Sequence, residues 1–93
     1  MNAPERDTAV TALERLAAEM NPIEFVTTLV AGDDRIPCLD VGTRSPQLSE
    51  TIYVQDGCFW WSWAERLAPI TDVPTAAAKI AAVLRLITEP ARG

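Results

Sequence analysis

The sequence predicts an α+β fold, a two-layer sandwich in which two helices cover one face of a four-stranded antiparallel meander. An amphipathic helical pattern lies at each end of the chain, and four apolar segments with strand composition lie between them. The connections between these segments are short, which favours antiparallel pairing over parallel crossovers. The 93 residues fit one domain, 1–93, because a second core would leave each half too small to fold unaided.

Both ends of the chain are predicted to be helical. Over 4–20 the apolar residues recur at spacings of three and four, which is typical of an amphipathic helix. Asn21-Pro22 ends this helix, because proline disfavours α geometry in the residue before it. The second helix is predicted over 73–88, with Asp72 as its N-cap.

Four strands are predicted from segments rich in β-branched and aromatic residues that end at turn-forming residues. The segments are 23–31, 36–41, 51–55 and 58–63. Asp56-Gly57 is a hairpin signal between the last two. The stretch 64–71 has no apolar period, so we expect a crossover loop there.

The alternation of side chains along a strand divides each strand into a face toward the helices and a face away from them. The heavier apolar set predicts the core residues Ile23, Phe25, Leu29, Leu39, Val41, Ile52, Val54, Phe59, Trp61 and Trp63. The opposite face is then too apolar for a fully solvated surface. We expect Val26, Val30, Tyr53 and Trp60 to form one patch there, and such patches mark interaction sites.

Three interpretations of this patch remain open. In the first, the 64–73 segment covers Trp60, or a bulge places all three tryptophans in one core. In the second, the patch contacts another copy of the chain, and in the third it contacts a different partner. Tyrosine and tryptophan are residue types that anchor interfaces.

Composition excludes several function classes. The chain has 8 Lys and Arg against 13 Asp and Glu, a net charge of −5, which disfavours binding to nucleic acid or anionic lipid and favours a basic or apolar protein segment. Histidine is absent, so the commonest general base and metal ligand is missing, and no cofactor is expected. The charged start of the chain resembles no export signal and no apolar tract approaches the roughly 20 residues of a membrane span, so we expect a cytoplasmic protein.

Two further groups of residues could carry chemistry. The carboxylates Asp33, Asp34, Asp40 and Glu50 fit no calcium-loop spacing, and adjacent aspartates after a glycine are typical of a solvated turn, so we predict neither a metal site nor catalytic residues. Cys38 and Cys58 are expected to be small buried hydrophobic residues, because cytosolic thiols stay reduced.

The sequence therefore predicts a non-enzymatic cytoplasmic interaction module, a homodimer that uses its apolar sheet face. The alternative is a small-molecule binding protein or weak enzyme, with a pocket formed by Trp61, Trp63, Glu65 and Arg66. A DNA-binding regulator ranks last, because the chain is acidic and lacks a helix-turn-helix pattern.

The aromatic motif carries a resemblance. With Phe59-Trp60-Trp61-Ser62-Trp63-Ala64-Glu65, followed by an aspartate and an alanine-rich helix, the chain resembles a family of small actinomycete proteins over about Phe25 to Arg85. This family brings no known activity, cofactor or catalytic residue, so the resemblance implies a bacterial, cytoplasmic protein and no more. At the level of fold alone, the order of elements is similar to that of dimeric secretion chaperones.

Overall fold

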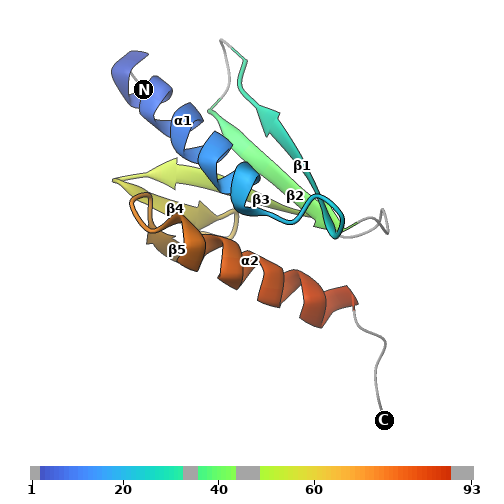
Figure 1. Ribbon diagram of the computed structural model, residues 1–93. Helices are drawn as coiled ribbons and strands as arrows, with labels where there is room; N and C mark the ends of the chain where they lie inside the picture. The colour runs from blue at the N-terminus through green and yellow to red at the C-terminus, as the bar shows by residue number, and fades with distance from the viewer. Residues whose placement is uncertain (1–2, 33–35, 44–48, 89–93) are drawn as a thin grey trace.

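Two helices and five strands make up the fold in the computed structural model (Figure 1), which describes residues 3–32, 36–43 and 49–88. In chain order the elements are α1 (Ala3–Glu19), β1 (Phe25–Val30), β2 (Cys38–Thr43), β3 (Ser49–Gln55), β4 (Cys58–Trp61), β5 (Arg66–Pro69) and α2 (Val73–Thr88). The strands form one antiparallel sheet in the order β1-β2-β3-β4-β5. The α+β class is confirmed, whereas the four-stranded meander is wrong because the sheet has a fifth strand.

The fifth strand lies inside the segment that we expected to be a crossover loop. β4 ends at Trp61, two residues earlier than predicted, because the chain turns back there. The Ala64 amide donates to the Trp61 carbonyl (3.0 Å), and the Trp61 amide donates to the Glu65 carbonyl (2.8 Å). These bonds close a tight hairpin, so the chain re-enters the sheet directly as β5.

A β-bulge explains why the alternation of side chains does not predict β5. The register between β4 and β5 shifts between Phe59 and Trp60, and the extra residue in β5 places Leu67 and Ala68 both in the core, at 2% and 5% exposure. Two consecutive buried residues have no period of two. The alternation of buried and exposed residues that identifies a strand in the sequence therefore does not occur in β5.

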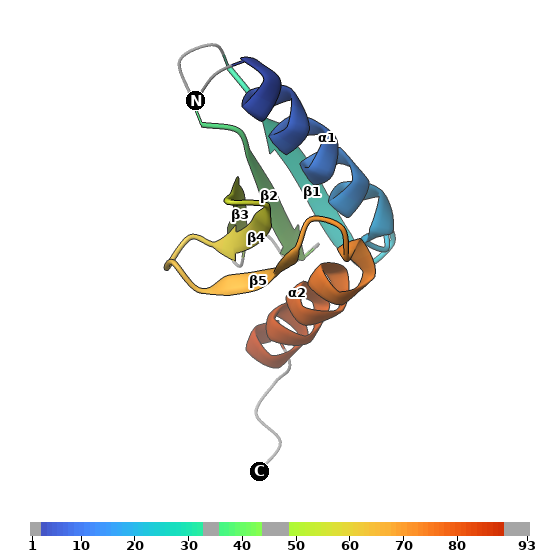
Figure 2. The same ribbon diagram turned by 90° about the vertical axis from the view of Figure 1, so that its left-hand side faces the viewer.

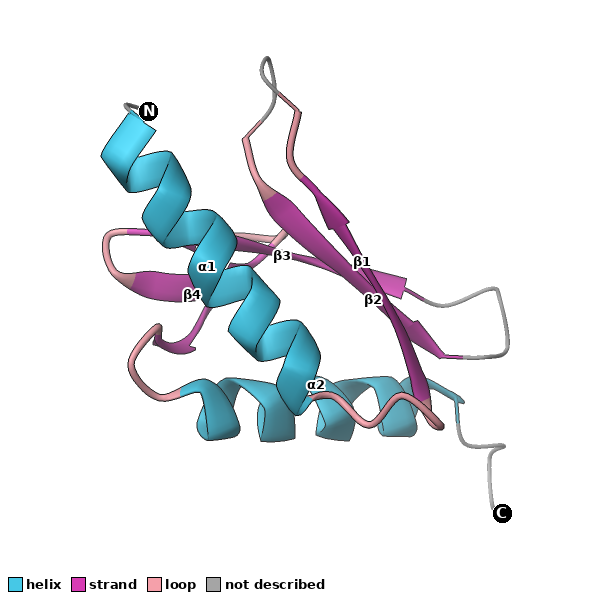
Figure 3. Cartoon of the chain, turned by 45° about the horizontal axis from the view of Figure 1, so that its top comes forward, coloured by secondary structure: helices cyan, strands magenta, loops and turns pink. Residues whose placement is uncertain are grey.

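The two helices lie on the same face of the sheet (Figure 2). α1 packs against β1, β2 and β3, while α2 packs against β2 and β5, and the C-terminal part of α1 lies beside α2 (Figure 3). Asp72 caps α2 as predicted, since its Oδ1 accepts a hydrogen bond from the Thr75 amide (3.4 Å). Lys79 Nζ donates to the Leu67 carbonyl (2.7 Å) and so ties α2 to the bulged part of β5.

One hydrophobic cluster contains side chains from both helices and all five strands. The predicted core residues that are buried in it are Phe25, Leu39, Val41, Ile52, Val54, Phe59 and Trp61, and Leu29 packs against them partly buried. Burial of these large side chains contributes on the order of 2 kcal/mol each before entropy costs. The cluster therefore holds the sheet and both helices together.

The core prediction is wrong for two residues. Ile23 is 79% exposed and Trp63 is 49% exposed. Ile23 lies in a turn, because the Asn21 carbonyl accepts bonds from the amides of Glu24 and Phe25 and the Asn21 side chain accepts one from the Ile23 amide. Trp63 lies in the hairpin turn after β4.

The other predicted boundaries are shifted by a few residues. α1 and α2 match the predicted 4–20 and 73–88 to within one residue. β1 begins at Phe25 instead of 23, β2 spans 38–43 instead of 36–41, and β3 begins at 49 instead of 51.

Candidate interaction surface

One row of side chains crosses four strands on the sheet face that points away from the helices. The strand register places Val30 beside Cys38, Cys38 beside Tyr53 and Tyr53 beside Trp60. All four side chains are half-buried, and among the described elements no helix lies over this face (Figure 2). We call these four residues the outer row.

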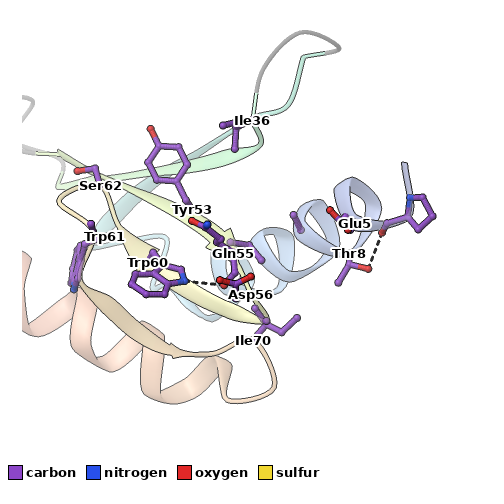
Figure 4. Close-up of a pocket in the computed structure, with 15 residues that line it drawn as sticks. Glu5, Thr8, Ile36, Tyr53, Gln55, Asp56, Trp60, Trp61, Ser62 and Ile70 are labelled. Carbon is purple, nitrogen blue, oxygen red and sulfur yellow. Dashed lines mark hydrogen bonds between the residues drawn. The ribbon is translucent and has the colours of Figure 1, made fainter. Parts of the chain in front are cut away.

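Trp60 is held in place by the hairpin that precedes it. Its indole Nε1 donates a hydrogen bond to the Gln55 carbonyl (2.8 Å), as Figure 4 shows. Asp56 and Gly57 between these residues have φ of 53° and 73°, the positive values that a tight two-residue hairpin turn requires. The turn thus fixes the carbonyl that orients the indole, and Trp60 and Tyr53 form an aromatic surface of defined geometry.

The structure places three of the four predicted patch residues together. Val30, Tyr53 and Trp60 belong to the outer row, whereas Val26 pairs with Gly42, further along β1, and is 49% exposed. The three tryptophans do not share one core, because Trp60 lies on the outer face while Trp61 is buried on the other.

Two members of this surface were not among the four predicted patch residues. Cys38 joins Val30 to Tyr53 within the row, and Ile36, which is 64% exposed, lies near Tyr53 (Figure 4). The register of β2 is the signal that places Cys38 beside Tyr53. Ile36 precedes β2, so its position near Tyr53 does not follow from strand register.

A hollow of about 930 Å³ follows the β3–β4 hairpin beside the outer row (Figure 4). Tyr53, Trp60 and Ile36 supply apolar lining, and its charged lining residues in the described chain are the carboxylates Glu5 and Asp56. Lysine and arginine do not occur among the described lining residues. The hollow therefore suits a basic or apolar group better than an anion.

The predicted ligand pocket does not form as expected. The Trp61 and Trp63 rings are stacked, with centroids 4.7 Å apart and planes inclined by 9°, and Trp63 Nε1 donates to Glu65 Oε2 (2.9 Å). Arg66 instead pairs with Trp60 in the sheet, and only Trp61 of the four residues lines the hollow.

Asp40 and Glu50, the two predicted carboxylates that the structure describes, do not converge on a metal site. Asp40 accepts a hydrogen bond from the Thr51 hydroxyl (2.8 Å), and Glu50, one residue earlier along β3, lies on the opposite face of the sheet from Thr51. Asp33 and Asp34 lie outside the described residues. Within the part of the chain that the structure describes, no group of three potential metal ligands occurs.

The two cysteines lie on the outer face, both half-buried and not joined by a disulfide. Cys38 and Cys58 are two strands apart in the sheet and offset by two residues along it, about 12 Å in all, whereas a disulfide needs Cα atoms within about 7 Å. The expectation that they are buried hydrophobic residues is wrong, because both side chains reach the surface.

An ion pair joins the end of α2 to the start of β1. Arg85 Nε and Nη2 donate to the two carboxylate oxygens of Glu24, each at 2.7 Å, and the guanidinium lies 5.9 Å from the centroid of the Phe25 ring. The hydrogen bonds from Arg85 lower the pKa of Glu24, and the carboxylate raises the pKa of Arg85. The carboxylate that immediately precedes β1 is thus neutralised by a partner within the chain.

No helix among the described residues is long and apolar enough to cross a membrane. The resemblance of the aromatic motif to small actinomycete proteins stays a prediction, since no family model, no curated protein and no solved structure matches this chain.

Proposed function

We propose that the chain is a non-enzymatic protein-interaction module of the bacterial cytoplasm, related to the small actinomycete proteins that its aromatic motif resembles. Its contact surface is the outer face of the sheet, and a second copy of the chain is the first partner. The observation that supports this most strongly is the outer row, four half-buried residues in register across four strands.

The outer row has the chemistry of an interface centre. A tryptophan and a tyrosine lie side by side, and tryptophan and tyrosine are the residue types enriched at interface hot spots. Because the indole N–H of Trp60 already donates to Gln55, an apolar partner can cover the ring without leaving that donor unsatisfied. Covering the Trp60 ring therefore removes apolar surface from water at little polar cost.

The charge near the outer row indicates what kind of partner, other than a second copy of the chain, could bind there. Glu5 and Asp56 are the charged groups of the neighbouring hollow, and the whole chain carries −5. Complementary charge favours encounter with the right partner. A basic or apolar protein segment fits this surface.

The test is the mass of the purified protein in solution, measured by light scattering for the wild type and for Trp60→Ala. We expect Trp60→Ala to lower the weight-average mass about twofold, because truncating an aromatic hot-spot residue costs about 2 kcal/mol of binding or more. Trp63→Ala is the matched control, since Trp63 is an exposed tryptophan in the adjacent turn, off the outer row. An unchanged mass for folded Trp60→Ala, or an equal loss in both variants, would overturn this proposal.

The second candidate function is a small-molecule binding protein, and the hollow beside Trp60 favours it. A ligand there would contact an aromatic surface and two carboxylates, so it would be neutral or cationic. Saturable quenching of tryptophan fluorescence by such a metabolite, without a change in mass, would favour this candidate over the first.

A further inference from the structure

The two edges of the sheet differ in how far they are protected against pairing with another strand. β5 has four residues, with a proline (Pro69), an exposed charge (Arg66) and an irregular register at its bulge. Short length, proline, charge and bulges are the features that keep an edge strand from pairing with another chain. β5 is therefore a blocked edge.

β1 has none of these protections. It has six residues, Phe25–Val30, with neither proline nor a charged side chain, and pairs with β2 in an unbroken register. In the described part of the chain the sheet ends at β1, so the outward N–H and C=O groups of this strand meet no further strand. A regular uncharged edge of this kind is a template for another strand.

The surroundings of β1 are apolar as well. Four large hydrophobic residues are exposed in the described chain, and two of them, Ile23 at 79% and Val26 at 49%, lie at this edge. Glu24, which immediately precedes β1, is paired with Arg85, and this pairing reduces like-charge repulsion between the starts of two such strands. Asp40 lies beside Thr28 on β2, one strand in from the edge, and accepts a hydrogen bond from Thr51.

We propose that β1 pairs with β1 of a second copy in antiparallel orientation, so that two sheets join into one of ten strands. The two-fold axis lies at Thr28, which faces the partner's Thr28 and places Val26 beside the partner's Val30. In this register even-numbered residues of one β1 pair with even-numbered residues of the other. Both outer faces therefore stay on one side of the joined sheet. Val26, which lies off the outer row within one chain, then extends the outer row of the other.

This contact uses a different surface from the one in the proposed function and does not depend on it. The edge lies in the plane of the sheet, whereas the outer row contacts a partner from above that plane. With both contacts made, the assembly is a dimer of dimers. Each contact can therefore be removed without removing the other.

Edge pairing over six residues buries little surface, so the contact is weak and depends on protein concentration. We expect the weight-average mass to rise between about 5 and about 500 µM. Thr28→Lys and Thr28→Glu should each lower the mass about twofold at the upper concentration, because like charges directly opposite each other destabilise a strand pair. Mixing the two variants should restore the mass, since Lys and Glu then face each other across the axis.

A control variant separates the edge contact from a contact through the outer face. Ala78→Lys, which adds the same charge at an exposed position of α2, away from both the edge and the outer face, should leave the mass unchanged. A folded Thr28→Lys variant with the mass of the wild type, or a mixture that gains no mass over its components, would overturn the proposal, as would a wild type that stays monomeric over the whole range. A loss of mass in Trp60→Ala bears only on the outer face.

Discussion

Ala64 has a left-handed backbone conformation, with φ of 65°, in the turn that joins β4 to β5. The amide of Ala64 donates to the Trp61 carbonyl, so the turn requires this geometry. In an alanine the Cβ atom comes too close to the following carbonyl oxygen, which costs roughly 1–2 kcal/mol. The protein therefore carries local strain at the residue that brings β5 back into the sheet.

Replacing this alanine should stabilise the protein. Ala64→Gly removes the clash of the Cβ atom but adds freedom to the unfolded chain, so we expect a net gain of about 0.5–1 kcal/mol in the free energy of unfolding. Urea unfolding should show a higher midpoint with an unchanged slope. Ala78→Gly, at an exposed position of α2, is the matched control and should lose about 1 kcal/mol. Equal losses in both variants would show that position 64 is not strained.

The three tryptophans show what can be predicted residue by residue. Alternation correctly placed Trp60 and Trp61 on opposite faces, because both lie within a regular strand. It failed for Trp63, because the strand had already ended in the turn at Trp61–Glu65. Alanine at the left-handed position conceals that turn, since glycine is the usual signal for it.

The helices and the longer strands were predictable because the spacing of apolar residues within each of them is that of a helix or a strand. α1 and α2 bury one stripe each, and half-buried and buried residues alternate over 38–41 in β2 and over 51–54 in β3. β5 was not predictable, because it is short and its bulge buries two consecutive residues. Its pairing depends on the hairpin before it and on the Lys79 contact from α2, neither of which is a local property of the segment.

The contact between α2 and β1 should depend on pH through one carboxylate. The pKa of Glu24 in the folded chain lies below its ordinary value of 4.5 because Arg85 donates hydrogen bonds to it. Its stabilising contribution is therefore complete above about pH 4.5 and is lost as the pH falls through the lower folded value. Glu24→Gln should be less stable than the wild type at about pH 6, and this difference should shrink by about pH 3.

Thermal unfolding followed by circular dichroism at several pH values measures this difference. Glu14→Gln, which removes an exposed carboxylate from α1, controls for the general effect of one charge. A difference between Glu24→Gln and the wild type that stays constant from neutral to acid pH would show that the ion pair contributes nothing to stability.

At the scale of the whole molecule, the sequence was sufficient for the class and for most of the core, but not for the surface. The spacing of apolar residues within an element predicts which of them are buried. The prediction is therefore correct for seven core residues. The outer row is decided by register, which aligns Val30, Cys38, Tyr53 and Trp60 from four separate strands. The register of these strands depends on the turns between them, so the predicted patch included Val26, which lies further along β1, and did not include Cys38.

Because one hydrophobic cluster joins both helices to every strand, the molecule should unfold as one cooperative unit. All three tryptophans lie between residues 60 and 63, so fluorescence reports on β4 and its hairpin, while far-ultraviolet circular dichroism is dominated by the helices. At low concentration the two probes should give the same urea midpoint. Leu84→Ala, at a fully buried position of α2, should lower both midpoints together, since it removes about 2–5 kcal/mol from the shared core. A fluorescence midpoint that stays at the wild-type value would mean that α2 detaches before the sheet unfolds, and that the outer face survives without it.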